Sequence, residues 1–301
     1  MAAKGQGQFA YNSLIMKIIE TYQAPTPLRP VSFEVFPPKG DLSQEAAYAM
    51  AAELTSLSPD FISVTYSAGG SGNKSATVEV ASMIQEEFKV PVMAHLTCID
   101  MTAEGFDAQV AALRSKGIEN VLALRGDRVP GSEPSDFPYA KDLIVRLREE
   151  GFCVGAAAYP EGHIECMDFP RSIEHLKLKQ DAGAQFFLTQ LFFDNQYFYR
   201  FQEAALAAGI AVPLSCGIMP FLGVEQIKRM VFMCGASLPS PIIKLLAKYA
   251  DAPDDLRKAG IEYACAQLVD LAQNGAEGFH IYTMNQPRIA RGATEALRAV
   301  L

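Results

Sequence analysis

The sequence predicts a (β/α)₈ barrel, formed as a single domain by residues 1–301. Two observations support this prediction. Eight short apolar runs recur along the chain, and segments with a helical pattern separate them. Strands that alternate with helices must be parallel, because each helix carries the chain back across the sheet. A doubly wound open sheet is the alternative fold for such an alternation.

The early strands begin ~30 residues apart, which is the length of one strand–helix unit. Helix formers fill the intervening segments, such as 43–57, 103–117 and 139–151, and the last two end in Gly, a common helix stop. A longer gap precedes the last strand and predicts extra helix over 223–235 and 253–275. Residues 1–27 are expected to form an additional helix that packs outside the barrel. The predicted strands are 31–38, 61–68, 91–99, 120–127, 153–160, 185–193, 212–220 and 279–285.

The composition predicts a soluble protein with a large core. Half of the residues are apolar, and 26 basic residues against 34 acidic ones give a net charge of −8. The basic face of a nucleic-acid-binding protein is therefore not expected. The apolar runs are too short for a signal peptide or a membrane span. We expect a cytoplasmic protein that binds neither nucleic acid nor membrane.

The cysteines and histidines do not suggest a disulfide framework or a metal site. The six cysteines lack C-x-x-C spacing and are expected to be free thiols in a reducing compartment. The four histidines lack the spacing of metal ligands, so no metal is expected. They are His95, His163, His175 and His280.

Polar side chains gather at the carboxyl ends of the predicted strands, which is where barrel enzymes carry their chemistry. Any one of them could be structural, but their recurrence on strand after strand predicts an active site at that end. These residues are Glu34, Thr65, Tyr66, His95, Thr97, Arg125, Asp127, Tyr159, Gln190, Tyr282 and Asn285.

Glu34 lies in the middle of the apolar run VSFEVFPP, where a charge is costly to bury. Buried carboxylates usually pair with a cation, so a structural ion pair is one interpretation. A partly apolar pocket would also favour the protonated form of the carboxyl group, which suits a proton donor at neutral pH. Both interpretations of Glu34 stay open at this point.

Two segments near the middle of the chain could face a large planar ligand. In ALRGD, Arg125 and Asp127 flank Gly126, as either a local ion pair or a carboxylate beside an approachable backbone. In AAAYPEGH, three alanines precede Tyr159 and either leave room for a ligand or narrow the barrel interior. His163 follows in a loop, where a histidine is most often solvated.

Ser172, His175 and Lys179 share one face of the next predicted helix, which could be solvated or turned toward a ligand. No G-x-G-x-x-G motif follows a predicted strand. A dinucleotide would therefore not be bound in the Rossmann manner, and the acid that reads its ribose is not identifiable.

Eight segments occur in an order and spacing that characterise one enzyme family. They are VSFEVFPP, FISVTYSAGG, AHLTCID, NVLALRGD, AAYPEGH, KQDAGA, TQLFFD and IYTMN. Together they resemble methylenetetrahydrofolate reductase of the compact bacterial type, over about residues 30–290. The resemblance implies a (β/α)₈ barrel that binds FAD at the carboxyl ends of its strands. It also implies ping-pong reduction of methylenetetrahydrofolate to methyltetrahydrofolate with NADH or NADPH, a reaction that serves methionine biosynthesis.

The resemblance further implies roles for single residues. Glu34 matches the general acid that protonates the folate, and Asp127 matches a carboxylate between flavin and pterin. Gln190 matches a residue that contacts folate and nicotinamide in turn, and Tyr282 and Gln286 complete the implied substrate contacts. The implied FAD contacts are Thr65, Tyr66, His95, Arg125, Gly126, Asp127, Tyr139, Ala140, Tyr159, His163, His175 and Lys179.

Three positions depart from the family pattern. Gln286 stands where the family often has an Arg that helps bind folate, and Arg288 follows two residues later. Val224 replaces an aromatic residue that covers the ligand, although Phe221 lies nearby. Leu178 stands where a basic residue often contacts FAD. The rim of the folate site is therefore expected to differ from that of typical members.

Two other functions fit the same segments. One is a methyltetrahydrofolate oxidase of one-carbon catabolism, and the other is a non-catalytic relative that only binds FAD. The presence of both Glu34 and Asp127 argues against the second. The implied partners are small molecules, namely the folate and the nicotinamide, and the chain is expected to form a homo-oligomer.

Overall fold

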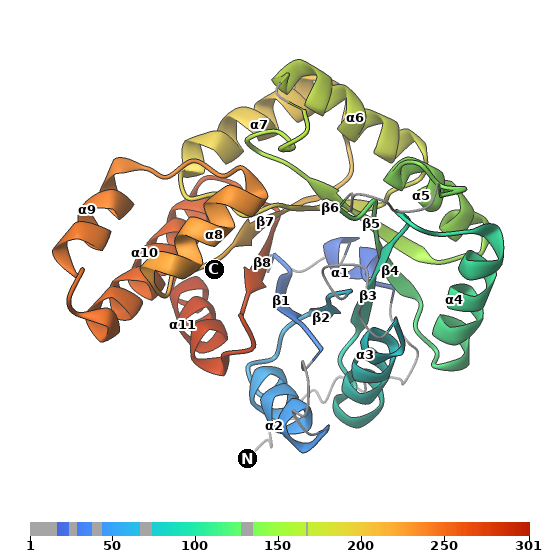
Figure 1. Ribbon diagram of the computed structural model, residues 1–301, viewed down its shortest axis with the longest axis horizontal. Coiled ribbons are helices and arrows are strands. Elements are labelled where there is room, and N and C mark those ends of the chain that lie inside the picture. The colour runs from blue at the N-terminus through green and yellow to red at the C-terminus, as the bar shows by residue number, and fades with distance from the viewer. Residues whose placement is uncertain (1–16, 24–28, 38–43, 67–73, 128–134, 167) are drawn as a thin grey trace, which may run out of the picture.

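Eight parallel strands close into a barrel in the computed structural model, in the order β1 to β8 (Figure 1). The structure describes residues 17–23, 29–37, 44–66, 74–127, 135–166 and 168–301. Helices surround the barrel, as expected for strands that all run in one direction. The predicted (β/α)₈ fold is confirmed, and the doubly wound sheet is excluded because β1 pairs with both β2 and β8.

Each strand coincides with a predicted one but ends earlier than expected. The polar residues Thr65, Arg125, Tyr159 and Gln190 therefore lie just beyond their strands, in the loops at the mouth of the barrel. The strands are β1 (Val31–Val35), β2 (Phe61–Val64), β3 (Val92–Thr97), β4 (Asn120–Leu124), β5 (Cys153–Ala158), β6 (Phe186–Thr189), β7 (Leu214–Ile218) and β8 (Gly278–Tyr282).

The extra helix predicted before the last strand is confirmed as α8 and α10. In sequence α9 comes between them, and it lies at the outer edge of the molecule (Figure 1). The helices are α1 (Ile19–Gln23), α2 (Gln44–Thr55), α3 (Lys74–Phe88), α4 (Ala103–Ser115), α5 (Ala140–Glu149), α6 (Phe169–Asp181), α7 (Asn195–Ala207), α8 (Val224–Cys234), α9 (Ser240–Lys248), α10 (Pro253–Gln273) and α11 (Pro287–Arg298).

Side chains that alternate along the strands divide the core into two layers. Phe33, Val35, Ile62 and Val64 point outward and belong to the main cluster between strands and helices. The residues between them point into the barrel, where a polar side chain such as Glu34 can reach the mouth. The period of two therefore places the apolar and the polar side chains of one strand on different faces.

The segment before β1 closes the amino end of the barrel instead of packing outside it. The Ile18 amide donates to Asn120 Oδ1 at 2.8 Å, and the Tyr22 hydroxyl lies 2.7 Å from Ser215 Oγ. The rings of Tyr22 and Phe186 stack with centroids 5.5 Å apart. We call the apolar side chains that fill this end the floor cluster: Ile18, Phe61, Met93, Leu122, Cys153, Phe186 and Leu188. Residues 1–16 and 24–27 of the predicted extension lie outside the described residues.

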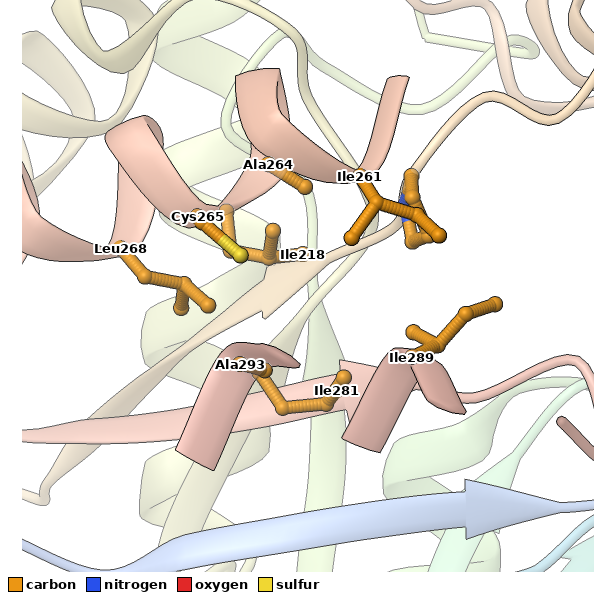
Figure 2. A pocket seen from close by; sticks show the side chains of 9 residues that line it. Ile218, Ile261, Ala264, Cys265, Leu268, Ile281, Ile289 and Ala293 are labelled. Carbon is orange, nitrogen blue, oxygen red and sulfur yellow. The ribbon is translucent and has the colours of Figure 1, made fainter. Parts of the chain in front are cut away.

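A separate apolar pocket lies on the outer side of the barrel, between α10 and α11 and the strands β7 and β8 (Figure 2). It contains no charged side chain and faces away from the mouth, so it is not the site predicted from the strand ends. The lining residues are Ile218, Pro220, Ile261, Ala264, Cys265, Leu268, Ile281, Ile289 and Ala293.

All six cysteines are free thiols, as predicted. Among the described residues, no cluster of His, Cys, Asp or Glu has the geometry to hold a metal ion. No helix in the described part of the chain is long and apolar enough to cross a membrane.

Candidate active site

Glu34 lies inside the mouth of the barrel between two histidines. Its Oε2 is 3.4 Å from His280 Nε2 and 3.7 Å from His95 Nε2. Both histidines are buried, whereas 20% of the Glu34 side chain is exposed. The barrel register explains this meeting, because β1 pairs with β8 and places Glu34 beside Tyr282 and Ser32 beside His280. The site is thus assembled from the first and last strands.

His95 does not form an ordinary ion pair with Glu34. Burial lowers the pKa of His95 to about 4, so this imidazole is neutral at pH 7. Its Nε2 is buried and has no hydrogen-bond partner. In the part of the chain that the structure describes, no Lys or Arg lies within ion-pair distance of Glu34. The interpretation as an ion pair with a Lys, an Arg or His95 is therefore not supported.

Ser32 links His280 to the protonation of Glu34. Its Oγ lies 2.8 Å from His280 Nδ1 and 3.2 Å from the Phe279 carbonyl oxygen. If Ser32 donates to Nδ1, the Nε2–H of His280 faces a Glu34 carboxylate. If Ser32 donates to the carbonyl, Nδ1–H donates to Ser32 and the bare Nε2 faces a protonated Glu34. Each state of the acid therefore has a matching imidazole tautomer.

The segment after β8 fixes the backbone of β1 on both sides of Glu34. Thr283 Oγ1 donates to the Glu34 carbonyl oxygen at 2.6 Å. Asn285 accepts from the Phe36 amide at 3.0 Å and donates to the Phe36 carbonyl oxygen at 2.8 Å. Met284 and Asn285 have φ of 52° and 53°, an uncommon conformation for residues other than Gly. This strained turn therefore fixes the position of Glu34 along the barrel axis.

Tyr282 spans the barrel interior next to Glu34. Its hydroxyl donates to the Thr189 carbonyl oxygen at 2.8 Å. Gly217 makes this possible, because a Cβ there would lie 2.1 Å from that oxygen and 2.9 Å from the Tyr282 ring. Burial raises the pKa of Tyr282 well above its ordinary value, and the Glu34 charge adds to the shift. Because the Tyr282 hydroxyl is already hydrogen-bonded, the ring is the part of this side chain that can contact a ligand in the mouth.

A second polar cluster lies at the ends of β4 and β5. Arg125 Nη1 contacts Glu165 Oε2 at 2.6 Å, and the Tyr159 and His163 rings meet edge to face at 4.7 Å. Lys179 of α6 donates to the Ala157 carbonyl oxygen at 2.7 Å and lies 5.3 Å from the Tyr159 ring. Two cations thus lie in this cluster with the carboxylate of Glu165, and the charge of Asp127 also acts on Tyr159 and His163. The structure brings together Arg125, Tyr159, His163 and Lys179 of the predicted cofactor residues.

Burial lowers the pKa of Lys179 from 10.5 to about 8, and the Arg125 charge adds to the shift. Below pH 8 the folded protein bears the full cost of the buried ammonium, and this cost disappears as the pH rises from about 8 to 10.5. The free energy of unfolding of the wild type, minus that of Lys179→Met, should therefore increase over this range. Urea unfolding at several pH values measures the difference, and a difference independent of pH would contradict the prediction.

The remaining predicted residues lie around these two clusters. Gly126 has a φ of +87°, and a Cβ there would come within 3.1 Å of Ile99, so only Gly fits. Asp127 is exposed at the mouth, and Thr65 and Tyr66 are half-buried just past β2.

Some predicted residues lie farther from the centre. Tyr139 and Ala140 begin α5, where Tyr139 is exposed and Ala140 is buried, and His175 is exposed on α6. Gln190 follows β6 and accepts a hydrogen bond from the Leu191 amide. Gln286 precedes α11. Their roles as ligand contacts stay predictions.

The structure also places the residues that depart from the family pattern. Phe221 is fully buried and packs 6.1 Å from the Tyr263 ring, so it does not replace the aromatic cover. Leu178 is 47% exposed on α6. Arg288 donates two hydrogen bonds to Gln286 Oε1, which places its guanidinium beside the Gln286 side chain.

A family model described as methylenetetrahydrofolate reductase matches residues 23–297. The chain belongs to the methylenetetrahydrofolate reductase family. It is 33% identical over 261 residues to 5,10-methylenetetrahydrofolate reductase of Escherichia coli, covering 86% of this chain and 88% of that one. It is also 34% identical over 274 residues to methylenetetrahydrofolate reductase 1 of Schizosaccharomyces pombe. The alignment covers 88% of this chain but only 45% of the fungal protein, so the chain spans about half the length of that relative.

Solved structures agree with the fold of the methylenetetrahydrofolate reductase family. An uncharacterized protein from Clostridium thermocellum, described as binding two copies of 5-methyl-5,6,7,8-tetrahydrofolic acid, superposes with a TM-score of 0.65. It is 13% identical in sequence, and the match covers 94% of this chain and 97% of that one. At this identity the likeness supports the barrel fold alone.

Sequence reasoning did not assign roles to Ser32 and His280, although both contact the centre of the site. The signal for them was the alternation within each strand, since Ser32 shares a face with Glu34 and His280 shares one with Tyr282. Only the pairing of β1 with β8 shows that these two faces meet.

Proposed function

We propose that the protein reduces 5,10-methylenetetrahydrofolate to 5-methyltetrahydrofolate with hydride from NADH or NADPH. The observation that carries this proposal is Glu34, a partly exposed carboxyl group that lies beside two histidines and, among the described residues, within ion-pair distance of no Lys or Arg. Such a group can hold a proton and deliver it at the mouth. The family relatives named methylenetetrahydrofolate reductase support the choice of substrate.

In this proposal Glu34 protonates the bridging nitrogen of the folate. The five-membered ring of the folate then opens and becomes a cation. His280 and Ser32 then stabilise the resulting carboxylate through the tautomer in which Nε2–H faces Glu34. Asp127 is exposed at the same mouth and stabilises the cation by its negative charge. Gln190 and the ring of Tyr282 orient the substrates, and Arg288 beside Gln286 is a candidate contact for the folate carboxylates.

The second cluster fits the FAD that the family resemblance implies. Lys179 and Arg125 bring an ammonium and a guanidinium group together beside Glu165, with Asp127 close enough for its charge to act on Tyr159 and His163. Two such donors can bind the oxygens of a diphosphate. Lys179, Arg125, His163 and Tyr159 would hold the cofactor, with Gly126 allowing close approach. When bound, FAD would supply the hydride chemistry that no side chain of this site can perform.

The test uses the purified full chain supplied with FAD. NADH or NADPH is mixed anaerobically with methylenetetrahydrofolate, and mass spectrometry detects methyltetrahydrofolate. Steady-state rates that give parallel double-reciprocal lines would support ping-pong use of one mouth. Product formation only in the reverse direction would favour the oxidase alternative, and FAD binding without turnover in either direction would favour the non-catalytic one. The ratio of the NADH and NADPH rates identifies the donor.

We also propose that the protein acts in the cytoplasm as a homo-oligomer. Its six free thiols support a reducing compartment. Phe232 and Met233 of α8, 86% and 54% exposed, support association through an apolar surface. Light scattering of the purified chain measures the oligomeric state.

A further inference from the structure

A carboxylate outside the two clusters joins the β5–α6 connection to the α8–α9 turn. Glu161 Oε1 and Oε2 lie 3.1 and 2.9 Å from the backbone nitrogen of Ser237, which donates to them. We call this contact the Glu161–Ser237 clasp. It connects segments that are 76 residues apart, and a charged acceptor makes its hydrogen bond stronger than a neutral one would be.

Apolar packing accompanies the clasp. α8 ends at Gly235, which has the left-handed φ of 67° that is common at helix ends. The Cα of Gly235 faces Ile164, since a Cβ built there would lie 3.6 Å from the Ile164 side chain. The β5–α6 connection and the α8–α9 turn therefore touch at two points, and Glu161 provides the polar one.

The β5–α6 connection is itself anchored at the mouth. Tyr159 and His163 lie on either side of Glu161 in sequence, and their rings are in contact. Glu165 of the same connection binds Arg125 at the end of β4. The clasp thus attaches the α8–α9 turn to a segment whose position is set by the second cluster.

The α8–α9 turn faces the catalytic carboxylates. Cys234 and Leu238, on either side of Ser237, pack against the same apolar cluster as Tyr282, the residue of β8 that pairs with Glu34. The charges of Asp127 and Glu34 also act on the Cys234 thiol, whose pKa is raised to about 11 mainly by burial. Cys234 is the last residue of α8, and Ser237 follows it in the turn. The end of α8 therefore forms one wall of the space above Glu34 and Asp127.

We propose that Glu161 is a positioning residue that holds the α8–α9 turn as one wall of the folate site. This inference rests on the proposed function, because it takes the ligand above Glu34 and Asp127 to be the folate. Without the clasp, the turn loses a charge-assisted hydrogen bond to the β5–α6 connection. The folate then binds to a wall that must first be ordered, which weakens binding and leaves the chemistry unchanged.

The experiment compares Glu161→Ala and Glu161→Gln with a matched control, Glu277→Ala. The Glu277 carboxylate also accepts a backbone hydrogen bond, from Leu214 at 3.0 Å, but at the amino end of the barrel. Glu161→Ala should raise KM for methylenetetrahydrofolate roughly tenfold, the effect of losing one charge-assisted hydrogen bond, with kcat changed less than about twofold. Glu161→Gln keeps one acceptor oxygen and should restore most of the affinity. Glu277→Ala should leave KM unchanged.

Two further measurements separate this inference from the proposed function. Hydrogen exchange of the peptide that contains Ser237 should be faster in Glu161→Ala than in the wild type, without any substrate present. Calorimetry with 5-methyltetrahydrofolate reports folate binding even if turnover is absent. A wild type without turnover would overturn the proposed function. Faster exchange with unchanged KM and unchanged 5-methyltetrahydrofolate affinity would overturn the role of Glu161, as would an equal loss in Glu277→Ala.

Discussion

Replacing Glu34 by Gln should lower the rate of methylenetetrahydrofolate reduction by roughly a hundredfold or more, the usual contribution of a general acid. The oxidation of NADH with an artificial quinone as acceptor should continue at nearly the wild-type rate, because that reaction needs no proton on the folate. Gln has the volume of Glu and keeps an oxygen toward His280, so the barrel should remain folded. Stopped-flow and steady-state assays with the two acceptors measure both rates.

Glu203→Gln provides the control for this prediction. Glu203 is exposed on α7, on the outside of the barrel, so the same chemical change there should affect neither reaction. Equal losses with both acceptors in Glu34→Gln would show that Glu34 supports the fold or the binding of the donor instead of protonating the folate.

Replacing Gly260 by Ala should destabilise the protein severely. Gly260 lies in α10 against the segment after β7, and a Cβ there would come within 1.8 Å of the Phe221 carbonyl oxygen. The Phe221 carbonyl is a backbone group and cannot rotate away as a side chain can. Either α10 or the β7–α8 connection must therefore move. Overpacking of this kind costs about 3 kcal/mol or more, which lowers Tm by about 6 °C. Differential scanning calorimetry measures the change.

Gly223→Ala is the matched control. Gly223 precedes α8, its φ of 176° is accessible to any residue, and a Cβ there would have no atom within 4 Å. Its Tm should stay close to that of the wild type. A Gly260→Ala protein with a wild-type Tm would mean that α10 packs less tightly against Phe221 than the structure shows.

The barrel could be predicted because its determinants are local. Each strand is a short apolar run that contains alternating faces, and each helix between strands has its own pattern of helix formers. The same local logic placed Glu34, Arg125, Tyr159 and Gln190 near the mouth, because a polar residue at the end of a strand is visible in the sequence. The strands end before most of these residues, which does not change the edge on which they lie.

The features that could not be predicted depend on contacts between distant segments. The meeting of Ser32 with His280 joins residues 248 apart, and it needs the closure of the barrel through β1 and β8. The placement of α1 across the amino end needs Asn120 and Ser215 as partners from two other strands. The sequence places Phe221 near the position of the missing aromatic cover, but its burial against Tyr263 of α10 depends on a contact between distant segments.

The floor cluster closes the amino end of the barrel in the described part of the chain and leaves the mouth as the open end. Ile18, Phe186 and their neighbours fill the lower half of the barrel, so in the described part of the chain a compound beside Glu34 can come and go only past the upper loops. Under the proposed function, the oxidised donor would leave by the same route before the folate enters. The closed amino end of the barrel would therefore make the two reactants bind one after the other. Part of this closure comes from α1, a helix only five residues long.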